Sequence, residues 1–253
     1  MPMKTVDCCI GIEYGRGRVL RQLLMAVALC VTANGAFAQS SNTEPLPDTI
    51  DSRVLACTAC HGTRGQGTHD DYFPRLAGKP AGYLYNQLIA FRDGQRKYPP
   101  MNYLLAYLPE AYLREIADYF AAQQTPFPVL PKPNVAPQVL VLGQQLVMMG
   151  DDARHIPACI ACHGASLTGV LPDMPGLLGL HSKYISAQLG ASRYGARISS
   201  KTNCMQKITA QLSEADITAV SAYLSSLPAP ANPAPAPAGS LKLALTCERA
   251  DTK

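Results

Sequence analysis

Apolar residues recur every three to four positions in three stretches of the chain, at residues 79–92, 109–123 and 212–227. This period places them on one face of an α-helix. The positions expected to face inward are Tyr83, Gln87, Leu88, Phe91, Leu113, Ile116, Ala117, Phe120, Ile217, Val220, Leu224 and Leu227. The pattern therefore predicts an amphipathic helix in each stretch.

The ends of these stretches carry residues that favour helix starts. Pro109 and Glu110 open the second stretch, where a missing N–H and a negative charge are both favourable. Ser213 precedes the third stretch and is the expected N-cap. No convincing alternation of apolar and polar residues indicates a strand. The predicted fold class is therefore all-α.

The chain contains an internal repeat, in which identical residues recur at a constant offset. At an offset of 101 residues, the matching pairs are Leu76/Leu177, Gly78/Gly179, Tyr83/Tyr184, Gln87/Gln188, Arg92/Arg193, Gly94/Gly195 and Arg96/Arg197. At an offset of 104, they are Met101/Met205, Leu108/Leu212, Glu110/Glu214 and Tyr119/Tyr223. Self-similarity of this kind is typical of a duplicated unit. We predict two tandem domains, at residues 39–124 and 138–227.

Residues 1–38 are predicted to be a cleaved signal peptide that sends the protein to the periplasm. Three arginines precede an apolar run at residues 23–31, and a small-x-small cleavage site follows at Ala36-Phe37-Ala38. The apolar run is too short to span a membrane. The leader carries four basic and two acidic residues, so its removal lowers the net charge from +4 to about +2. A charge this small indicates no nucleic-acid partner.

Two proline-rich segments separate and follow the domains. Four prolines between residues 126 and 133 exclude a helix there, so residues 125–137 are expected to form an extended linker. Residues 228–253 begin with an alternation of proline and alanine. This composition predicts an extended tail without a core of its own.

The same five-residue motif occurs once in each domain, as Cys57-Thr58-Ala59-Cys60-His61 and as Cys159-Ile160-Ala161-Cys162-His163. C-x-x-C-H is the attachment pattern of c-type haem, in which two thiols add to the porphyrin vinyl groups. Zinc binding and dithiol chemistry are the alternatives for the cysteine pair. The imidazole that follows the second cysteine is an axial ligand of the iron. The motifs predict two covalent haem c groups, attached at Cys57, Cys60, Cys159 and Cys162, with His61 and His163 as iron ligands.

A methionine at a matching place in each copy is the predicted sixth ligand of the iron. Met101 lies 40 residues after His61, and Met205 lies 42 residues after His163. Two prolines precede Met101, so we expect it to lie on a rigid extended loop. A thioether suits iron(II) and raises the reduction potential. Alternatively, these methionines fill the core. In the second domain, the competing ligands are Met148, Met149, Met174 and the thiolate of Cys204.

The sequence resembles the class I cytochromes c and, among them, the di-haem cytochrome c4 family. The likeness rests on the two motifs, the late methionines, the run Phe-Pro-Arg-Leu-Ala-Gly at residues 73–78 and the pattern Q-L-x-x-F-R-x-G-x-R at residues 87–96. It covers most of residues 50–227. The resemblance implies that the carbonyl groups of Pro74 and Pro175 accept the N–H of the axial histidines. It also implies a periplasmic electron carrier, with peripheral membrane association as a further expectation.

The chain departs from that family at Cys204, at Cys247 and in the proline-rich tail. Without the leader six cysteines remain, and four of them belong to the motifs. An even remainder in an oxidising compartment predicts a disulfide between Cys204 and Cys247. The segment before Cys57 is short, so the usual first helix is expected to be poorly formed.

Other charged residues allow two interpretations. A guanidinium group suits the carboxylate of a haem propionate. Arg75, Arg92, Arg96 and Arg193 therefore either bind propionates or lie on a solvated face of the protein. We expect His69, His155 and His181 to be surface residues, because they have no counterpart in the repeat.

Two closed, six-coordinate haems predict an electron carrier rather than an enzyme. The resemblance to cytochromes c4 implies a terminal oxidase as the acceptor, and the expected donor is a quinol-oxidising complex or a dehydrogenase. One alternative is the cytochrome subunit of a periplasmic dehydrogenase complex. Another is a di-haem enzyme, a peroxidase or a thiosulfate-oxidising protein, for which Cys204 beside Met205 would supply a thiolate ligand.

Covalent attachment can be tested directly. If the four motif cysteines form thioether bonds, the purified protein keeps its colour through acid–acetone extraction. Its mass then exceeds that of the cleaved chain by two haems. Colour that passes into the acetone contradicts the prediction. As a control, a variant in which Cys159 and Cys162 are both replaced by alanine should have a mass that is lower by one haem.

Overall fold

The computed structural model describes residues 47–197 and 204–241. The predicted signal peptide and Cys247 lie outside these residues. None of the described helices is both long enough and apolar enough to cross a membrane.

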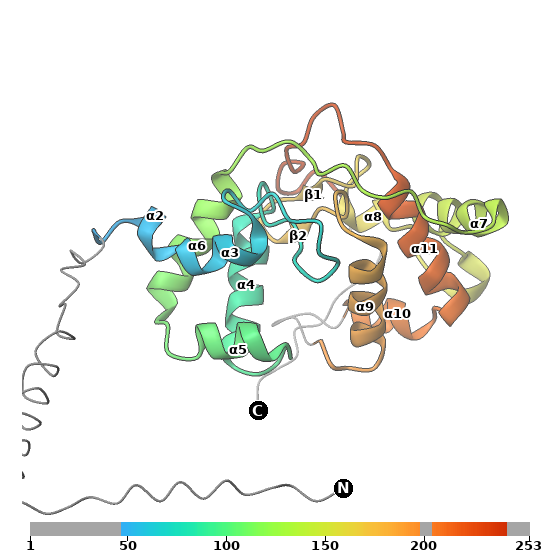
Figure 1. The fold of residues 1–253 in the computed structure, drawn as a ribbon. Helices are drawn as coiled ribbons and strands as arrows, with labels where there is room; N and C mark the ends of the chain where they lie inside the picture. The colour runs from blue at the N-terminus through green and yellow to red at the C-terminus, as the bar shows by residue number, and fades with distance from the viewer. Residues whose placement is uncertain (1–46, 198–203, 242–253) are drawn as a thin grey trace, which may run out of the picture. The chain divides into compact units, whose positions relative to one another are not determined.

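The first group of helices forms a domain of its own, which we call the first domain (Figure 1). It contains α2 (Ile50–Arg53), α3 (Leu55–His61), α4 (Ala81–Arg92), α5 (Pro99–Leu105) and α6 (Glu110–Ala122). Helix α4 packs against α6. The buried apolar residues of this core are Val54, Leu84, Phe91, Leu105, Leu113, Ile116, Ala117 and Phe120. The initial helix α2 has only 4 residues, so the expected weak first helix is confirmed.

A second group of elements forms the second domain (Figure 1). It contains α7 (Pro137–Met148), the 3-10 helix η1 (Asp152–Arg154), α8 (Ile160–His163), strands β1 (Gly169–Val170) and β2 (Met174–Pro175), α9 (Ser182–Arg193), α10 (Cys204–Ala210) and α11 (Glu214–Ser226). Helix α11 packs against α7 and α9. Its core gathers Leu146, Val147, Ile156, Leu167, Leu178, Leu180, Ile185, Leu212, Ile217, Val220 and Leu224.

The start of α11 is fixed by the cap that the sequence indicates. The hydroxyl of Ser213 accepts a hydrogen bond from the backbone N–H of Asp216, and the Asp216 carboxylate accepts one from the N–H of Ser213. This reciprocal pair satisfies two of the donors that a helix start leaves unpaired. The predicted N-cap is therefore confirmed.

The expectation of an extended loop at Met101 is wrong, because residues 99–105 form α5. Proline is tolerated in the first turn of a helix, where its missing N–H has no partner to lose. Asn102 holds this helix to α4. Its Nδ2 donates to the carbonyl oxygens of Phe91 at 2.6 Å and Arg96 at 2.9 Å, and its Oδ1 accepts from the N–H of Tyr98 at 2.8 Å.

The proline-rich tail is anchored to the second domain. Strands β1 and β2 pair antiparallel as a short hairpin. The N–H of Leu171 donates to the carbonyl of Ala236 at 2.9 Å, and the N–H of Ala236 donates to the carbonyl of Gly169 at 2.8 Å. The tail thus adds a third segment to the edge of the hairpin, which composition alone does not indicate.

Two helical glycines provide a matched test of packing in the second domain. A Cβ added at Gly143 of α7 would collide with the carbonyl oxygen of Ala219 in α11, whereas one added at Gly190 of α9 meets nothing within 4 Å. We expect Gly143→Ala to destabilise the protein by about 1–3 kcal/mol, because the helices must separate. Gly190→Ala should be neutral or stabilising by up to about 1 kcal/mol. Thermal unfolding of the holoprotein, followed by circular dichroism, compares the two; equal effects would contradict the close α7–α11 contact.

Two candidate haem sites

Each domain contains a cavity at its C-x-x-C-H motif. The cavity of the first domain has a volume of about 380 Å³, and its lining includes Cys57, Cys60, His61 and Met101. The cavity of the second domain has a volume of about 400 Å³, and its lining includes Cys159, Cys162, His163 and Met205. Both volumes lie in the range of cofactor sites in proteins. The fold thus brings each motif together with the methionine predicted as its partner.

Each motif histidine is held by a proline carbonyl. The Nδ1 of His61 lies 2.9 Å from the carbonyl oxygen of Pro74, and the Nδ1 of His163 lies 2.8 Å from that of Pro175. This hydrogen bond orients the ring and leaves Nε2 as the atom that can bind a metal. Burial lowers the pKa of both histidines, so each imidazole is neutral at pH 7, which is the metal-binding form.

A glycine after each histidine ends the motif helix. Gly62 has φ +84° and Gly164 has φ +85°, a backbone conformation that side chains disfavour. These turns send the chain back toward the histidine, where Pro74 and Pro175 follow. The repeated dipeptide His-Gly is the sequence signal for this turn.

All four motif cysteines have free thiols and line the cavities. Burial raises the pKa of Cys57 and of Cys159 to about 11, so both are protonated at neutral pH. Among the described residues, no group of three or more histidine, cysteine, aspartate or glutamate side chains is placed to hold a metal ion. The cysteine pairs therefore lack the further ligands that a zinc site needs, and their thiols are placed for bonding to a group inside the cavity.

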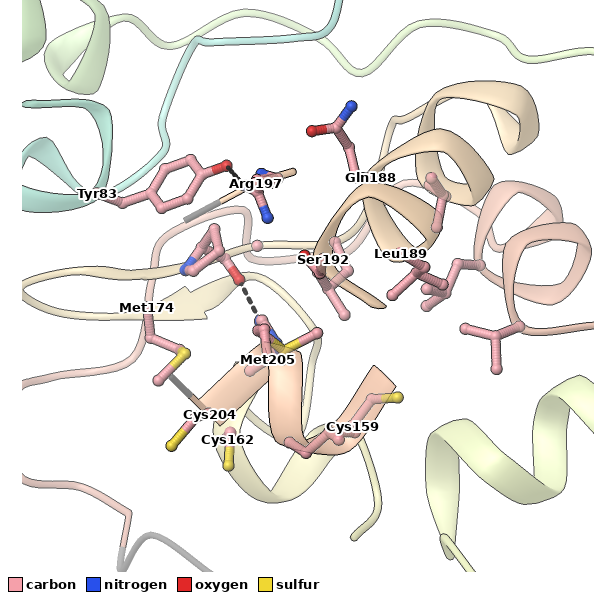
Figure 2. A pocket seen from close by; sticks show the side chains of 18 of the residues that line it. Tyr83, Cys159, Cys162, Met174, Gln188, Leu189, Ser192, Arg197, Cys204 and Met205 are labelled. Carbon is pink, nitrogen blue, oxygen red and sulfur yellow. Dashed lines mark hydrogen bonds between the residues drawn. The ribbon is translucent and has the colours of Figure 1, made fainter. Parts of the chain in front are cut away.

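Two methionines reach the cavity of the second domain from different elements. Met205 lies in the first turn of α10, and Met174 lies in β2 next to Pro175 (Figure 2). At the offset of 101, Met174 matches Phe73, whose ring stands edge-on to His61 with the ring centres 6.4 Å apart. Met174 thus belongs to the segment that holds the histidine, and Met205 is the counterpart of Met101.

The other competing ligands in the second domain lie elsewhere or are engaged. Met148 and Met149, at the end of α7, are 37 % and 77 % exposed and are not among the residues of the cavity. Cys204 lines the cavity but is disulfide-bonded, so it offers no thiolate. Its proposed partner, Cys247, lies outside the described residues, and the pairing stays a prediction.

A reciprocal hydrogen-bond network joins the two domains. Arg96 donates to the hydroxyl of Tyr184 at 3.0 Å and to Gln188 Oε1 at 2.7 Å. Arg197 donates to the hydroxyl of Tyr83 at 3.0 Å, as Figure 2 shows, and to Gln87 Oε1 at 3.2 Å. The residues that line both cavities are Tyr83, Gln87, Tyr184, Gln188 and Arg197.

Cationic side chains are buried between the cavities without carboxylate partners among the described residues. Lys79 and Arg96 are 8 % and 9 % exposed, and they donate to carbonyl, amide and hydroxyl oxygens only. Arg197 Nε is buried and has no hydrogen-bond partner in the described part of the chain. Burial lowers the pKa of Lys79 to about 7, and the positive charges of Arg75 and Arg197 add to this effect.

These observations match the chemistry of haem c. The group needs two thiols, an imidazole and a soft sixth ligand, which both cavities offer. Its propionates are anions, and buried cations are stabilised by anions in a medium of low dielectric constant. The residues present therefore fit one haem c in each cavity.

The other three arginines that the sequence offered as propionate partners make contacts of their own, and Arg75 also lines the first cavity. Arg75 donates to the carbonyl oxygens of Thr125 and Pro126, each at 2.7 Å, and its guanidinium carbon lies 4.2 Å from the centre of the Phe127 ring. It therefore fastens the linker to the first domain. Arg92 and Arg193 form ion pairs at the surface with Asp93 and Glu214.

The expectation that His181 is a surface residue is wrong. It is 8 % exposed, its Nε2 lies 3.0 Å from the carbonyl oxygen of Thr68, and its Nδ1 lies 3.2 Å from the Asp71 carboxylate. It belongs to the contact between the domains. A position without a repeat counterpart can be buried where the two copies face each other, because that face is not used identically by both.

Neither Arg197 nor Lys79 is among the site residues predicted from the sequence. The pairing of Arg96 with Arg197 in the repeat was a signal for the first of them. For Lys79 the repeat gives no signal, because Leu180 occupies the matching position.

Known proteins show the same arrangement of two copies. The cytochrome c family model matches residues 53–117 and 140–228. A cytochrome c4 of Pseudomonas aeruginosa is 36 % identical over 212 residues, covering 83 % of this chain and 98 % of that protein. A thiosulfate dehydrogenase electron acceptor of Thiomonas intermedia (strain K12) is 34 % identical over 175 residues, covering 69 % of this chain and 80 % of that protein.

A solved structure agrees at the level of the fold. The crystal structure of reduced recombinant cytochrome c4 from Pseudomonas stutzeri superposes with a TM-score of 0.62 at 32 % identity. The match covers 70 % of this chain and 96 % of that one. With the motifs, the cavities and the duplicated fold, this shows that the chain belongs to the cytochrome c family and is a cytochrome c4-like protein.

Proposed function

We propose that the chain carries two haem c groups in the periplasm and relays electrons between protein partners, with no substrate of its own. Thioether bonds would form at Cys57, Cys60, Cys159 and Cys162, and the axial pairs would be His61 with Met101 and His163 with Met205. The observation that carries this proposal is the repetition of one constellation. In each domain a histidine fixed by a proline carbonyl shares a cavity with a methionine on a helix.

The residues of the chain suit electron transfer. Bound haem c supplies an iron that accepts and releases one electron. The histidines and methionines would keep the same ligation in both oxidation states, so little rearrangement accompanies the change in charge. The thioether favours the reduced state and raises the reduction potential. Asn102 holds α5, and with it Met101, in place through three hydrogen bonds.

Among the described residues, neither cavity is lined by a glutamate or by a histidine other than the motif histidine. A peroxidase requires an acid–base residue beside an open position on the iron. No Asp or Glu is among the described residues that line the first cavity. In the second, Asp173 is the acidic residue present, and it adjoins Met174 on the hairpin that holds His163. The disulfide at Cys204 also removes the thiolate that supported a thiosulfate-oxidising enzyme.

A second candidate function concerns the partner. The similar protein of Thiomonas intermedia is a thiosulfate dehydrogenase electron acceptor. This supports a role as the electron acceptor of a dehydrogenase, either as a free carrier or as its cytochrome subunit. A terminal oxidase is the acceptor that the resemblance to cytochromes c4 favours.

The relay can be tested by replacing the methionines. The reduced unmodified protein should bind negligible carbon monoxide at neutral pH. Met101→Leu and Met205→Leu should each open one haem, lower the potential of that site and allow one carbon monoxide to bind. Met174→Leu is the matched control in the second cavity and should leave carbon monoxide binding and both potentials close to those of the unmodified protein.

Optical spectra and potentiometric titration give these results. Rapid stoichiometric binding of carbon monoxide by the unmodified protein contradicts the relay and favours an enzyme. If Met174→Leu opens the second haem and Met205→Leu does not, the assignment of the ligand is wrong. Stopped-flow mixing with a reduced thiosulfate dehydrogenase tests whether that enzyme is the donor. If it is, the dehydrogenase should reduce this protein within the turnover time of the enzyme.

A further inference from the structure

The hairpin of the second domain is held from the first domain. Its strand β2 ends at Pro175, whose carbonyl oxygen binds His163. The carbonyl oxygen of the next residue, Gly176, accepts a hydrogen bond from Lys79 Nζ at 2.8 Å. Lys79 belongs to the first domain and lies two residues before α4. A side chain of one domain therefore contacts the peptide that adjoins the histidine-binding carbonyl of the other.

A backbone contact strengthens this connection. The N–H of Gly82, in the first turn of α4, donates to the carbonyl oxygen of Pro172 at 3.1 Å. The approach is so close that a Cβ at Gly82 would lie 2.7 Å from that oxygen. Pro172 and Gly176 lie on either side of β2. The segment that starts α4 thus fixes both ends of the strand that carries Pro175.

The charge of Lys79 also acts on the second site. Lys79 is buried, so water screens its charge only weakly. Its Nζ lies 2.8 Å from the carbonyl oxygen of Gly176, and the preceding residue, Pro175, holds His163. The lysine therefore lies close to the histidine of the domain to which it does not belong.

In the part of the chain that the structure describes, no side chain of the second domain makes the equivalent hydrogen bond to the first. The matching residue of the second domain is Leu180, which is 6 % exposed and has no charge. The second domain instead contacts Thr68 and Asp71 through His181, and these residues precede Pro74 by three or more positions. Only the Lys79 contact, among the described residues, reaches the residue next to a histidine-binding proline.

We propose that Lys79 is a positioning residue through which the first domain sets the orientation of His163 and the reduction potential of the second haem. This rests on the proposed function, because it requires a haem in the second cavity. A buried positive charge disfavours the oxidised iron, which carries one positive charge more than the reduced iron. In its protonated form Lys79 therefore raises the potential of the second site and differentiates two otherwise similar haems.

The experiment compares two lysine variants of the full-length holoprotein. Lys79→Met removes the charge and the hydrogen bond while keeping the length of the side chain. Lys207→Met makes the same change at an exposed residue of α10, two positions after Met205. Potentiometric titration should show that Lys79→Met lowers the potential of the second haem more than that of the first. Lys207→Met should change either potential less, because water screens its charge. The titration step of the first haem is identified by its shift in Met101→Leu.

Two further variants separate charge from structure. Lys79→Arg keeps the charge, so the reduction potential of the second haem should stay close to that of the unmodified protein. Gly82→Ala keeps the charge but pushes on the hairpin. It should move the NMR signal of the His163 Nδ1 proton in the reduced protein, while that of His61 stays in place. These readouts also serve if Lys79→Met folds poorly.

Each outcome bears on the proposal. Equal shifts of both potentials in Lys79→Met, or no shift, would overturn it, as would an unchanged His163 signal in both Lys79→Met and Gly82→Ala. Failure of the proposed function would appear separately, in the unmodified protein, as fewer than two haems or as a site without methionine ligation.

Discussion

The hydrogen bond between a buried imidazole and a proline carbonyl sets the geometry of each domain. In both copies Nδ1 lies within 2.9 Å of the oxygen, so the ring is fixed and Nε2 is directed to the cavity. A glycine at positive φ after each histidine makes the return of the chain possible. The cysteines, the methionine and the apolar core are arranged around this pair. Without it, the imidazole would rotate and the iron would lose a defined ligand field.

The contact between the domains follows from a second constraint, the burial of positive charge. Arg96 and Arg197 extend across the contact to matching tyrosine and glutamine residues of the opposite copy. Their hydrogen bonds satisfy most of the donors, but neutral oxygens do not neutralise the charge. Two haems with anionic propionates would do so. The same residues would then hold the domains together and place the cofactors near each other.

The two copies of the repeat have similar sites that differ in detail. Phe73 has Met174 as its counterpart beside the histidine, and the tail occupies the edge of a hairpin in the second domain. Lys79 has Leu180 as its counterpart, so one domain contributes a charge that the other lacks. A two-haem carrier benefits from such asymmetry, because different potentials give the electron a preferred direction.

The sequence by itself determined the chemistry, the duplication and the principal helices. These depend on local patterns: the motif spacing at Cys57 and Cys159, the period of α4, α6 and α11, and the cap at Ser213. Only the tertiary structure decided that Met101 lies on a helix, that Arg75 holds the linker and that His181 is buried. Lys79 shows the reason most clearly. Its partner lies 97 residues away in the other domain, and a contact at that distance leaves no periodicity or motif in a single chain.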